Sequence, residues 1–201
     1  MLGAMAERIY EGVPAYRGYT MGPALLWRGW PSLPELLAAR LPVVVVASYL
    51  DSGMIARLER SRLLGVVTDR GSMIDPSYEA LRALERPGVV GARGIAAEAR
   101  PGDLVAVDAA LGTVVLRPGP ELQARAAALK GRRAEPEPQG FEAVLERLVV
   151  PIRQAWLRRG RPIPFDLDEQ RALYAMIWRI CAGGLPGPED DALLHRILHQ
   201  S

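Results

Sequence analysis

Short runs of apolar residues, separated by turn formers, dominate the first 118 residues of the chain. Val43–Ala47 is an uninterrupted apolar, mostly β-branched run, which is typical of a strand buried on both faces of a sheet. Four further runs predict short strands: Gly65–Thr68, Gly88–Gly91, Leu104–Asp108 and Thr113–Leu116. Pro101–Asp103 and Ala110–Gly112 are predicted turns between them. Gly12–Trp27 mixes turn formers with an apolar end and predicts a loop that enters a strand.

Helical spacing of apolar residues occurs between these runs. Ser32 is a predicted N-cap for a short helix that ends at Arg40. Asp51 or Ser52 is predicted to cap a second helix, whose predicted inward-facing residues are Ile55, Leu58 and Leu63. Strands and helices that alternate, followed by a run of strands, are typical of an α/β layered domain.

The pattern becomes helical after Pro118. Glu121–Lys130 is an alanine-rich predicted helix, and Arg132–Gly140 has the proline and charge content of a linker. Three more helices are predicted over Phe141–Arg159, with a kink or interruption at Pro151, over Asp166–Cys181, and from Pro188 to Gln200. Their apolar residues predict packing on one another or on a partner. We therefore divide the chain into an α/β domain (1–118), a helix with a linker (119–140) and a small helical region (141–201).

Composition narrows the classes of partner and compartment. The chain has 25 Lys and Arg against 23 Asp and Glu, a net charge of +2, so its charge predicts no nucleic-acid partner. Cys181 is the only cysteine, which excludes an intrachain disulfide and favours an intracellular compartment. Met1–Tyr10 lacks the apolar run of a signal peptide, and no stretch approaches the roughly 20 apolar residues of a membrane span. We expect a cytoplasmic protein without membrane contact.

The turn residues and strand order resemble one family over about half of the chain. Residues 12–24, GVPAYRGYTMGPA, are similar to the G-I-P-A-S-P-G-x-A-x-G-x-A opening of enzyme I, the phosphoenolpyruvate-protein phosphotransferase of the bacterial sugar phosphotransferase system. Positions that match the same family continue through Val46, Ala47, Leu50, Ala56, Leu58, Leu64, Gly65, Thr68, Asp69, Gly71, Pro87, Val89, Val90, Gly91, Gly102, Asp103, Val107, Asp108 and Gly112. The resemblance implies the α/β fold of the swivelling β/β/α phosphohistidine domain for residues 1–118. This is the mobile domain of enzymes that use phosphoenolpyruvate (PEP), and here a helical region follows it.

The resemblance also implies the position of a phosphoryl-carrying histidine, where this chain has Pro76. The family sequence G-G-x-T-S-H-A-A-I aligns with GSMIDPSYE at residues 71–79, and only Gly71 is retained. A phosphocarrier needs a nucleophilic imidazole nitrogen at a helix N-terminus, and a proline ring has no nitrogen free to accept a phosphoryl group. Asp75 and Pro76 are instead a favourable N-cap and first-turn residue. We therefore predict that no catalytic residue stands here.

Two other parts that the resemblance implies are also missing. Arg28–Pro42 replaces the inserted helical domain that docks the small phosphocarrier protein in enzyme I. The barrel that binds PEP and magnesium should follow Pro118, but too few residues remain for it. We expect neither a cofactor nor a metal site.

Other candidate sites have a structural interpretation that we favour. The loop before the helix at Pro76 offers possible anion-binding residues, namely Thr68, Asp69, Gly71, Ser72, Asp75 and Ser77. His195 and His199 have the spacing of two metal ligands but lack an evident third. Asp69 and Asp108 can be interpreted as paired carboxylates or as turn residues. The basic cluster beside Trp156, a possible nucleic-acid contact, comprises Arg153, Arg158, Arg159 and Arg161.

The function predicted from the sequence is that of a non-catalytic homologue of the mobile domain. Its C-terminal helices would provide a docking, regulatory or self-association module for a protein partner or a second copy. The alternative is a phosphotransfer component that works in trans or uses Asp75, Ser72 or Ser77 as its acceptor. A third interpretation is a small-anion sensor that uses the loop at Gly71.

Overall fold

The computed structural model describes residues 6–29, 34, 41–58, 62–129, 137–159 and 166–199. The contacts between residues divide the chain into two compact units. The first, which we call the α/β unit, comprises residues 1–71 and 75–135. The second, the helical unit, comprises residues 136–201 together with Ser72–Ile74. The helical unit therefore includes three residues from the middle of the α/β sequence.

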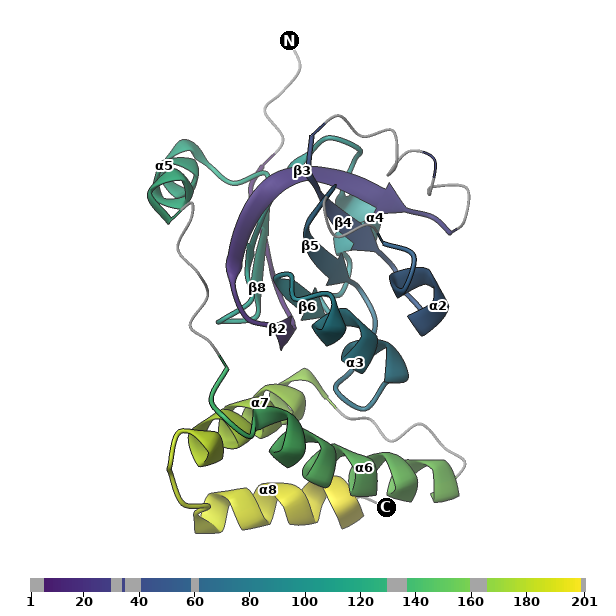
Figure 1. The fold of residues 1–201 in the computed structure, drawn as a ribbon. Coiled ribbons are helices and arrows are strands. Elements are labelled where there is room, and N and C mark those ends of the chain that lie inside the picture. The colour runs from purple at the N-terminus through teal and green to yellow at the C-terminus, as the bar shows by residue number, and fades with distance from the viewer. Residues whose placement is uncertain are drawn as a thin grey trace. The chain divides into compact units, whose positions relative to one another are not determined.

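The described part of the α/β unit contains an eight-stranded sheet, whose strands lie in the order β1-β8-β7-β3-β4-β5-β6-β2. Its strands are β1 (Arg8–Glu11), β2 (Val13–Tyr16), β3 (Tyr19–Trp27), β4 (Val43–Ala47), β5 (Leu63–Thr68), β6 (Gly88–Val90), β7 (Leu104–Asp108) and β8 (Thr113–Leu116). The first half of β3 pairs antiparallel with β7, and its second half pairs parallel with β4. Because of this change of partner, the long curved β3 joins an antiparallel and a parallel part of the sheet (Figure 1).

The structure confirms the strands that were predicted from continuous apolar runs. All five residues of β4 are buried, as expected for a strand covered on both faces. The core of the unit gathers side chains from both parts of the sheet, among them Leu26, Val67, Val107 and Leu116. The sequence pattern therefore identified β4 correctly as a strand buried on both faces.

Three features of the α/β unit differ from the sequence-based expectation. The strand predicted at the apolar end of Gly12–Trp27 is confirmed as part of β3, but the loop predicted before it is wrong, because β2 and the first part of β3 occupy it. These residues become strands by pairing with β6 and β7, which lie far away in the sequence. Strand β1 and the short helix α4 (Ile95–Glu98) were not predicted at all. Leu63, expected on a helix, is the first residue of β5.

Three other helices belong to the α/β unit, and two of them begin near predicted caps. Helix α2 (Ser52–Ile55) is capped by Asp51, whose Oδ1 accepts a hydrogen bond from the amide of Met54 at 2.8 Å. Helix α3 (Pro76–Ala83) begins at Pro76 with Asp75 at the N-cap, although the Asp75 side chain makes no capping hydrogen bond. Helix α5 (Pro120–Leu129) follows β8. The helix predicted to end at Arg40 lies outside the described residues, apart from Pro34.

Two side chains of α3 fasten this helix to the strand at the end of the sheet. The hydroxyl of Tyr78 donates a hydrogen bond to the carbonyl of Pro14 at 2.6 Å. The guanidinium of Arg82 donates to the carbonyl of Ala15 at 2.9 Å. Both side chains are buried, and hydrogen bonds to buried carbonyls are costly to lose. Helix α3 is therefore an integral part of the α/β unit.

The helical unit consists of α6 (Phe141–Arg159), α7 (Leu167–Cys181) and α8 (Pro188–His199) together with Ser72–Ile74. Helix α6 continues through Pro151, so the predicted interruption is wrong. The helices pack on one another, as expected. Phe141 contacts the rings of Tyr174 and Trp178 edge-on, with centroids 5.6 and 5.8 Å apart. No described helix has the length and the apolar character required to cross a membrane.

Candidate functional site

The loop after β5 begins with residues whose polar groups stabilise the loop itself. The hydroxyl of Thr68 donates to the carbonyl of Arg70 at 2.7 Å. The carboxylate of Asp69 accepts a hydrogen bond from the amide of Ala96, in the first turn of α4, at 2.8 Å. The amides of Asp69 and Arg70 donate to the carbonyls of Ala47, the last residue of β4, and Ser48, each at 3.0 Å. Thr68 and Asp69 therefore have evident structural roles.

Gly71, the one residue retained from the family signature, has a backbone conformation that favours glycine. Its φ is +121°, and a Cβ placed there would lie 3.4 Å from Cβ of Val90. A side chain at this position would be strained by the backbone, whereas its contact with Val90 of β6 would be an ordinary one. Gly71 is also the last residue before the chain enters the helical unit. Its retention thus has a structural reason that is independent of phosphate chemistry.

The next three residues, Ser72–Ile74, belong to the helical unit. Met73 and Ile74 are only 1% and 2% exposed. The amide of Met73 donates to Oε1 of Gln170 on α7 at 3.3 Å. Nε of Arg153 on α6 donates to the carbonyl of Ile74 at 2.7 Å. This segment is therefore held by both an apolar contact surface and two side chains of the helical unit.

Sequence reasoning did not find these contacts, although one signal for them was present. The apolar residues Met73 and Ile74 stand where the family has an unspecified residue and a threonine. Gln170 and Arg153, their partners, lie 97 and 79 residues away along the chain. The apolar pair indicated burial, but only the fold identifies the surface that buries it.

Asp75, Pro76 and Ser77 are part of the α/β unit again, at the start of α3. Ser77 is only 4% exposed. The six candidate anion-binding residues are consequently divided, because Ser72 belongs to the helical unit and the other five to the α/β unit. Anion binding by this set stays a prediction.

The remaining candidate site residues predicted from the sequence lie in separate elements of the structure. Asp108 accepts hydrogen bonds from the amides of Ala110 and Leu111 within the turn between β7 and β8. His195 is exposed on α8, and the side chain of His199 lies outside the described part. Among the described residues, no group of three or more His, Cys, Asp or Glu side chains is arranged to hold a metal ion.

The basic cluster is only partly described. Arg153 binds the carbonyl of Ile74, as noted above, and Arg158 is exposed. Arg161 and the side chains of Trp156 and Arg159 lie outside the described residues. Cys181 is half-buried, and burial raises the pKa of its thiol, with a smaller contribution from the charge of Glu137. A raised thiol pKa disfavours the reactive thiolate.

Comparison with known proteins identifies the family of the α/β unit. Residues 40–112 match the family model described as "PEP-utilising enzyme, mobile domain". Residues 40–112 form a homologue of this mobile domain. The matched range includes the loop at Gly71, the segment Ser72–Ile74 and helix α3. The mobile-domain homologue therefore supplies three residues of the helical unit, of which Met73 and Ile74 are buried.

Curated relatives agree with this assignment. The chain is 37% identical to phosphoenolpyruvate-protein phosphotransferase of Geobacillus stearothermophilus over 111 residues, which is 55% of this chain and 18% of that protein. It is 31% identical to the enzyme of the same name from Streptomyces coelicolor over 150 residues, covering 66% of this chain and 27% of that protein. The chain thus spans about a fifth to a quarter of the length of these relatives.

Solved structures of enzyme I are also similar in sequence to the mobile-domain homologue. An NMR structure of enzyme I is 28% identical, with a TM-score of 0.41, over 47% of this chain and 40% of that chain. The N-terminal domain of Enzyme 1-Nitrogen is 27% identical, with a TM-score of 0.40, over 50% of this chain and 42% of that chain.

Proposed function

We propose that the chain is a non-catalytic homologue of the PEP-utilising mobile domain. The observation that carries this proposal is the local structure at the phosphohistidine position. Pro76 begins α3, and the three residues that precede Asp75 belong to the helical unit, with Met73 and Ile74 buried. A phosphoryl carrier must present its nucleophile to a donor and then to an acceptor. Pro76 is exposed, but its ring has no nitrogen free to accept the group, and the segment before it is hydrogen-bonded within the helical unit.

The retained role in this proposal is that of a docking or self-association module in the cytoplasm. The helical unit exposes two large apolar side chains, Leu157 on α6 at 70% and Leu185 before α8 at 86%. In this proposal, these two leucines are the residues through which a protein partner or a second copy of the chain would make contact. The phosphotransferase activity of the longer relatives is not carried over to this chain.

Incubation of the purified protein with PEP, magnesium and intact enzyme I tests the non-catalytic role. Phosphate-sensitive intact-mass spectrometry is expected to show the unmodified mass of this chain. Enzyme I in the same mixture serves as the positive control, because it accepts the phosphoryl group itself. A stable phosphoryl adduct on this chain would overturn the proposal.

The same measurement also tests the alternative phosphotransfer function. If an adduct forms, the variants Ser72→Ala, Asp75→Asn and Ser77→Ala identify its position by the loss of the added mass. Ser77 is a poor candidate because its side chain is buried. Failure of all three variants to remove the adduct would exclude these residues as acceptors.

Self-association through the helical unit is tested by light scattering after size-exclusion chromatography. We expect the mass of the particle to rise with concentration, and Leu157→Glu to shift it towards the monomer. Ile9→Glu is a matched control, because Ile9 is similarly exposed but lies on β1 of the α/β unit. An unchanged monomer mass at every concentration would exclude self-association.

A further inference from the structure

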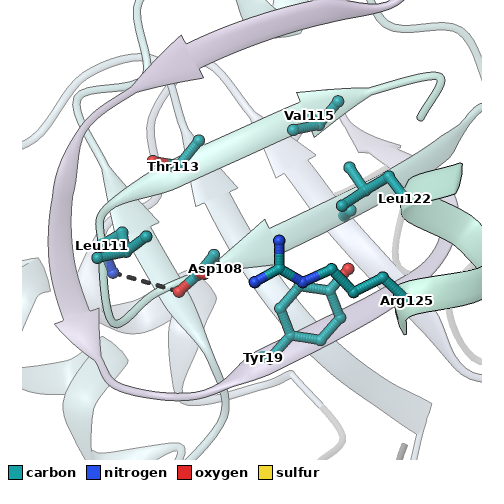
Figure 2. A pocket seen from close by; sticks show the side chains of 8 residues that line it. Tyr19, Asp108, Leu111, Thr113, Val115, Leu122 and Arg125 are labelled. Carbon is teal, nitrogen blue, oxygen red and sulfur yellow. Dashed lines mark hydrogen bonds between the residues drawn. The ribbon is translucent and has the colours of Figure 1, made fainter. Parts of the chain in front are cut away.

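A cavity of about 180 Å³ lies in the α/β unit between the antiparallel part of the sheet and α5 (Figure 2). Its lining includes residues of β3, β7, β8 and α5. The volume is about six times the ~30 Å³ that one water molecule occupies in the liquid. A ligand for this cavity must therefore be small, with a size near that of a free amino acid.

The cavity combines apolar walls with two opposite charges. Ala106 and Val115 of the sheet and Leu122 of α5 provide the apolar lining. Asp108 and Arg125 bring a carboxylate and a guanidinium to the same cavity, and Figure 2 shows the Arg125 guanidinium directed towards the side of Asp108. The two side chains form no ion pair with each other in the described part of the chain. A ligand with one charge would satisfy only one of them.

The carboxylate of Asp108 is fixed in position by the turn that follows β7. The amides of Ala110 and Leu111 both donate to its Oδ1, at 3.1 and 3.2 Å. The turn therefore does not use Oδ2, the other oxygen. A preorganised carboxylate of this kind can accept hydrogen bonds from a cation without a further cost in ordering.

The hydroxyl of Tyr19 provides a third polar group. It is buried, and it has no hydrogen-bond partner among the described residues. Burial raises the pKa of Tyr19, the nearby charge of Asp108 raises it further, and Arg125 opposes the shift. The hydroxyl therefore remains protonated at neutral pH, and it becomes available as a donor to a ligand when neighbouring side chains of the cavity move. Buried polar groups without a partner are uncommon in folded proteins.

We propose that this cavity binds a small aliphatic α-amino acid in its zwitterionic form. The ammonium group faces Asp108, and the carboxylate faces Arg125 and the hydroxyl of Tyr19. The aliphatic side chain packs against Ala106, Val115 and Leu122. This arrangement neutralises both charges of the cavity at once and covers its apolar wall. The site is separate from the loop at Gly71 and goes beyond the proposed function.

Isothermal titration calorimetry of the full chain with leucine tests the ligand class. We expect saturable binding with a Kd of about 1 mM or tighter. 3-Methylbutylamine lacks the carboxylate and 4-methylpentanoate lacks the ammonium group, so each is expected to bind at least about tenfold more weakly. Absence of saturable binding by leucine, or binding of either analogue as tight as that of leucine, would overturn the proposal.

Variants of the polar groups test the location of the site. Arg125→Met and Tyr19→Phe are each expected to weaken leucine binding at least about threefold. Asp108→Asn keeps an oxygen for the turn but removes the charge, so a similar loss is expected without a change of fold. Arg93→Met, an exposed arginine of the same unit outside the cavity lining, is the control and should leave the Kd unchanged. Leucine binding that survives all three cavity substitutions would place the ligand elsewhere and contradict the assignment.

Discussion

At the scale of single residues, the close approach of Gly12 and Gly112 is a strict requirement of the α/β unit. The amide of Gly12 donates to the carbonyl of Gly112 at 2.8 Å. Gly112 has a φ of +70°, and a Cβ added there would lie 2.3 Å from the carbonyl oxygen of Gly12. Position 112 therefore excludes a side chain by both backbone conformation and contact.

Replacement of Gly112 by alanine is expected to destabilise the protein strongly. Gly102→Ala is the matched control, because Gly102 has a φ of +85° but no atom within 4 Å of an added Cβ. The positive φ alone costs about 1 to 2 kcal/mol, and the contact with Gly12 should add at least about 2 kcal/mol for Gly112→Ala. Urea unfolding measures both differences. Equal losses for the two variants would show that the contact with Gly12 is not required.

The sequence indicated the local role of such residues but not their distant contacts. Gly112 was predicted as a turn residue, and Pro76 as a residue that starts a helix, because both roles depend on backbone preferences. The contact of Gly112 with Gly12 spans a hundred residues and has no local signature.

At the scale of helices and strands, prediction succeeded where burial alone determines the structure. Strands β4, β7 and β8 have the predicted bounds, because their apolar runs are consistent only with buried strands. Strand β1 is mostly exposed and forms by pairing with β8. Helix α4 has four residues, too few for a periodic pattern. Both depend on neighbours in space that the sequence does not reveal.

The connection between α7 and α8 provides a prediction about pH. Asp190 is only 5% exposed, accepts a hydrogen bond from the amide of Gly187 at 2.7 Å, and is bound by the guanidinium of Arg179. The Gly187 hydrogen bond, followed by that of Arg179, lowers the pKa of Asp190 below its ordinary value of 3.8. A lowered pKa in the folded state means that this stabilisation is present above pH 3.8 and is lost as the pH falls towards the lowered value.

Asp190→Asn is therefore expected to lower the melting temperature at neutral pH and to reduce its decrease in acid. Thermal unfolding followed by circular dichroism over a pH series measures this effect. Asp191→Asn is the control, since Asp191 is the exposed neighbour on the same turn of α8. The same acid dependence in Asp190→Asn and in the unaltered protein would contradict the role assigned to Asp190.

At the scale of the whole molecule, the main finding is that the helical unit includes a segment from the middle of the α/β sequence, Ser72–Ile74. The sequence indicated an α/β part followed by helices, because hydrophobic period and proline-rich composition change after Pro118. It gave no indication that Ser72–Ile74 belong to the helical unit. That assignment depends on a buried apolar pair and on partners in α6 and α7. The position of this loop was therefore predictable, while its packing in the helical unit was not.

Amide hydrogen exchange at Met73, followed by NMR in the full chain, tests this assignment most directly. If Ser72–Ile74 form part of the helical core, the Met73 amide should exchange as slowly as the buried part of α7, and Gln170→Ala should accelerate it. Gln123→Ala, which removes an amide side chain from α5, should leave that rate unchanged. Exchange of Met73 at the rate of an exposed loop would contradict the packing of this segment in the helical unit.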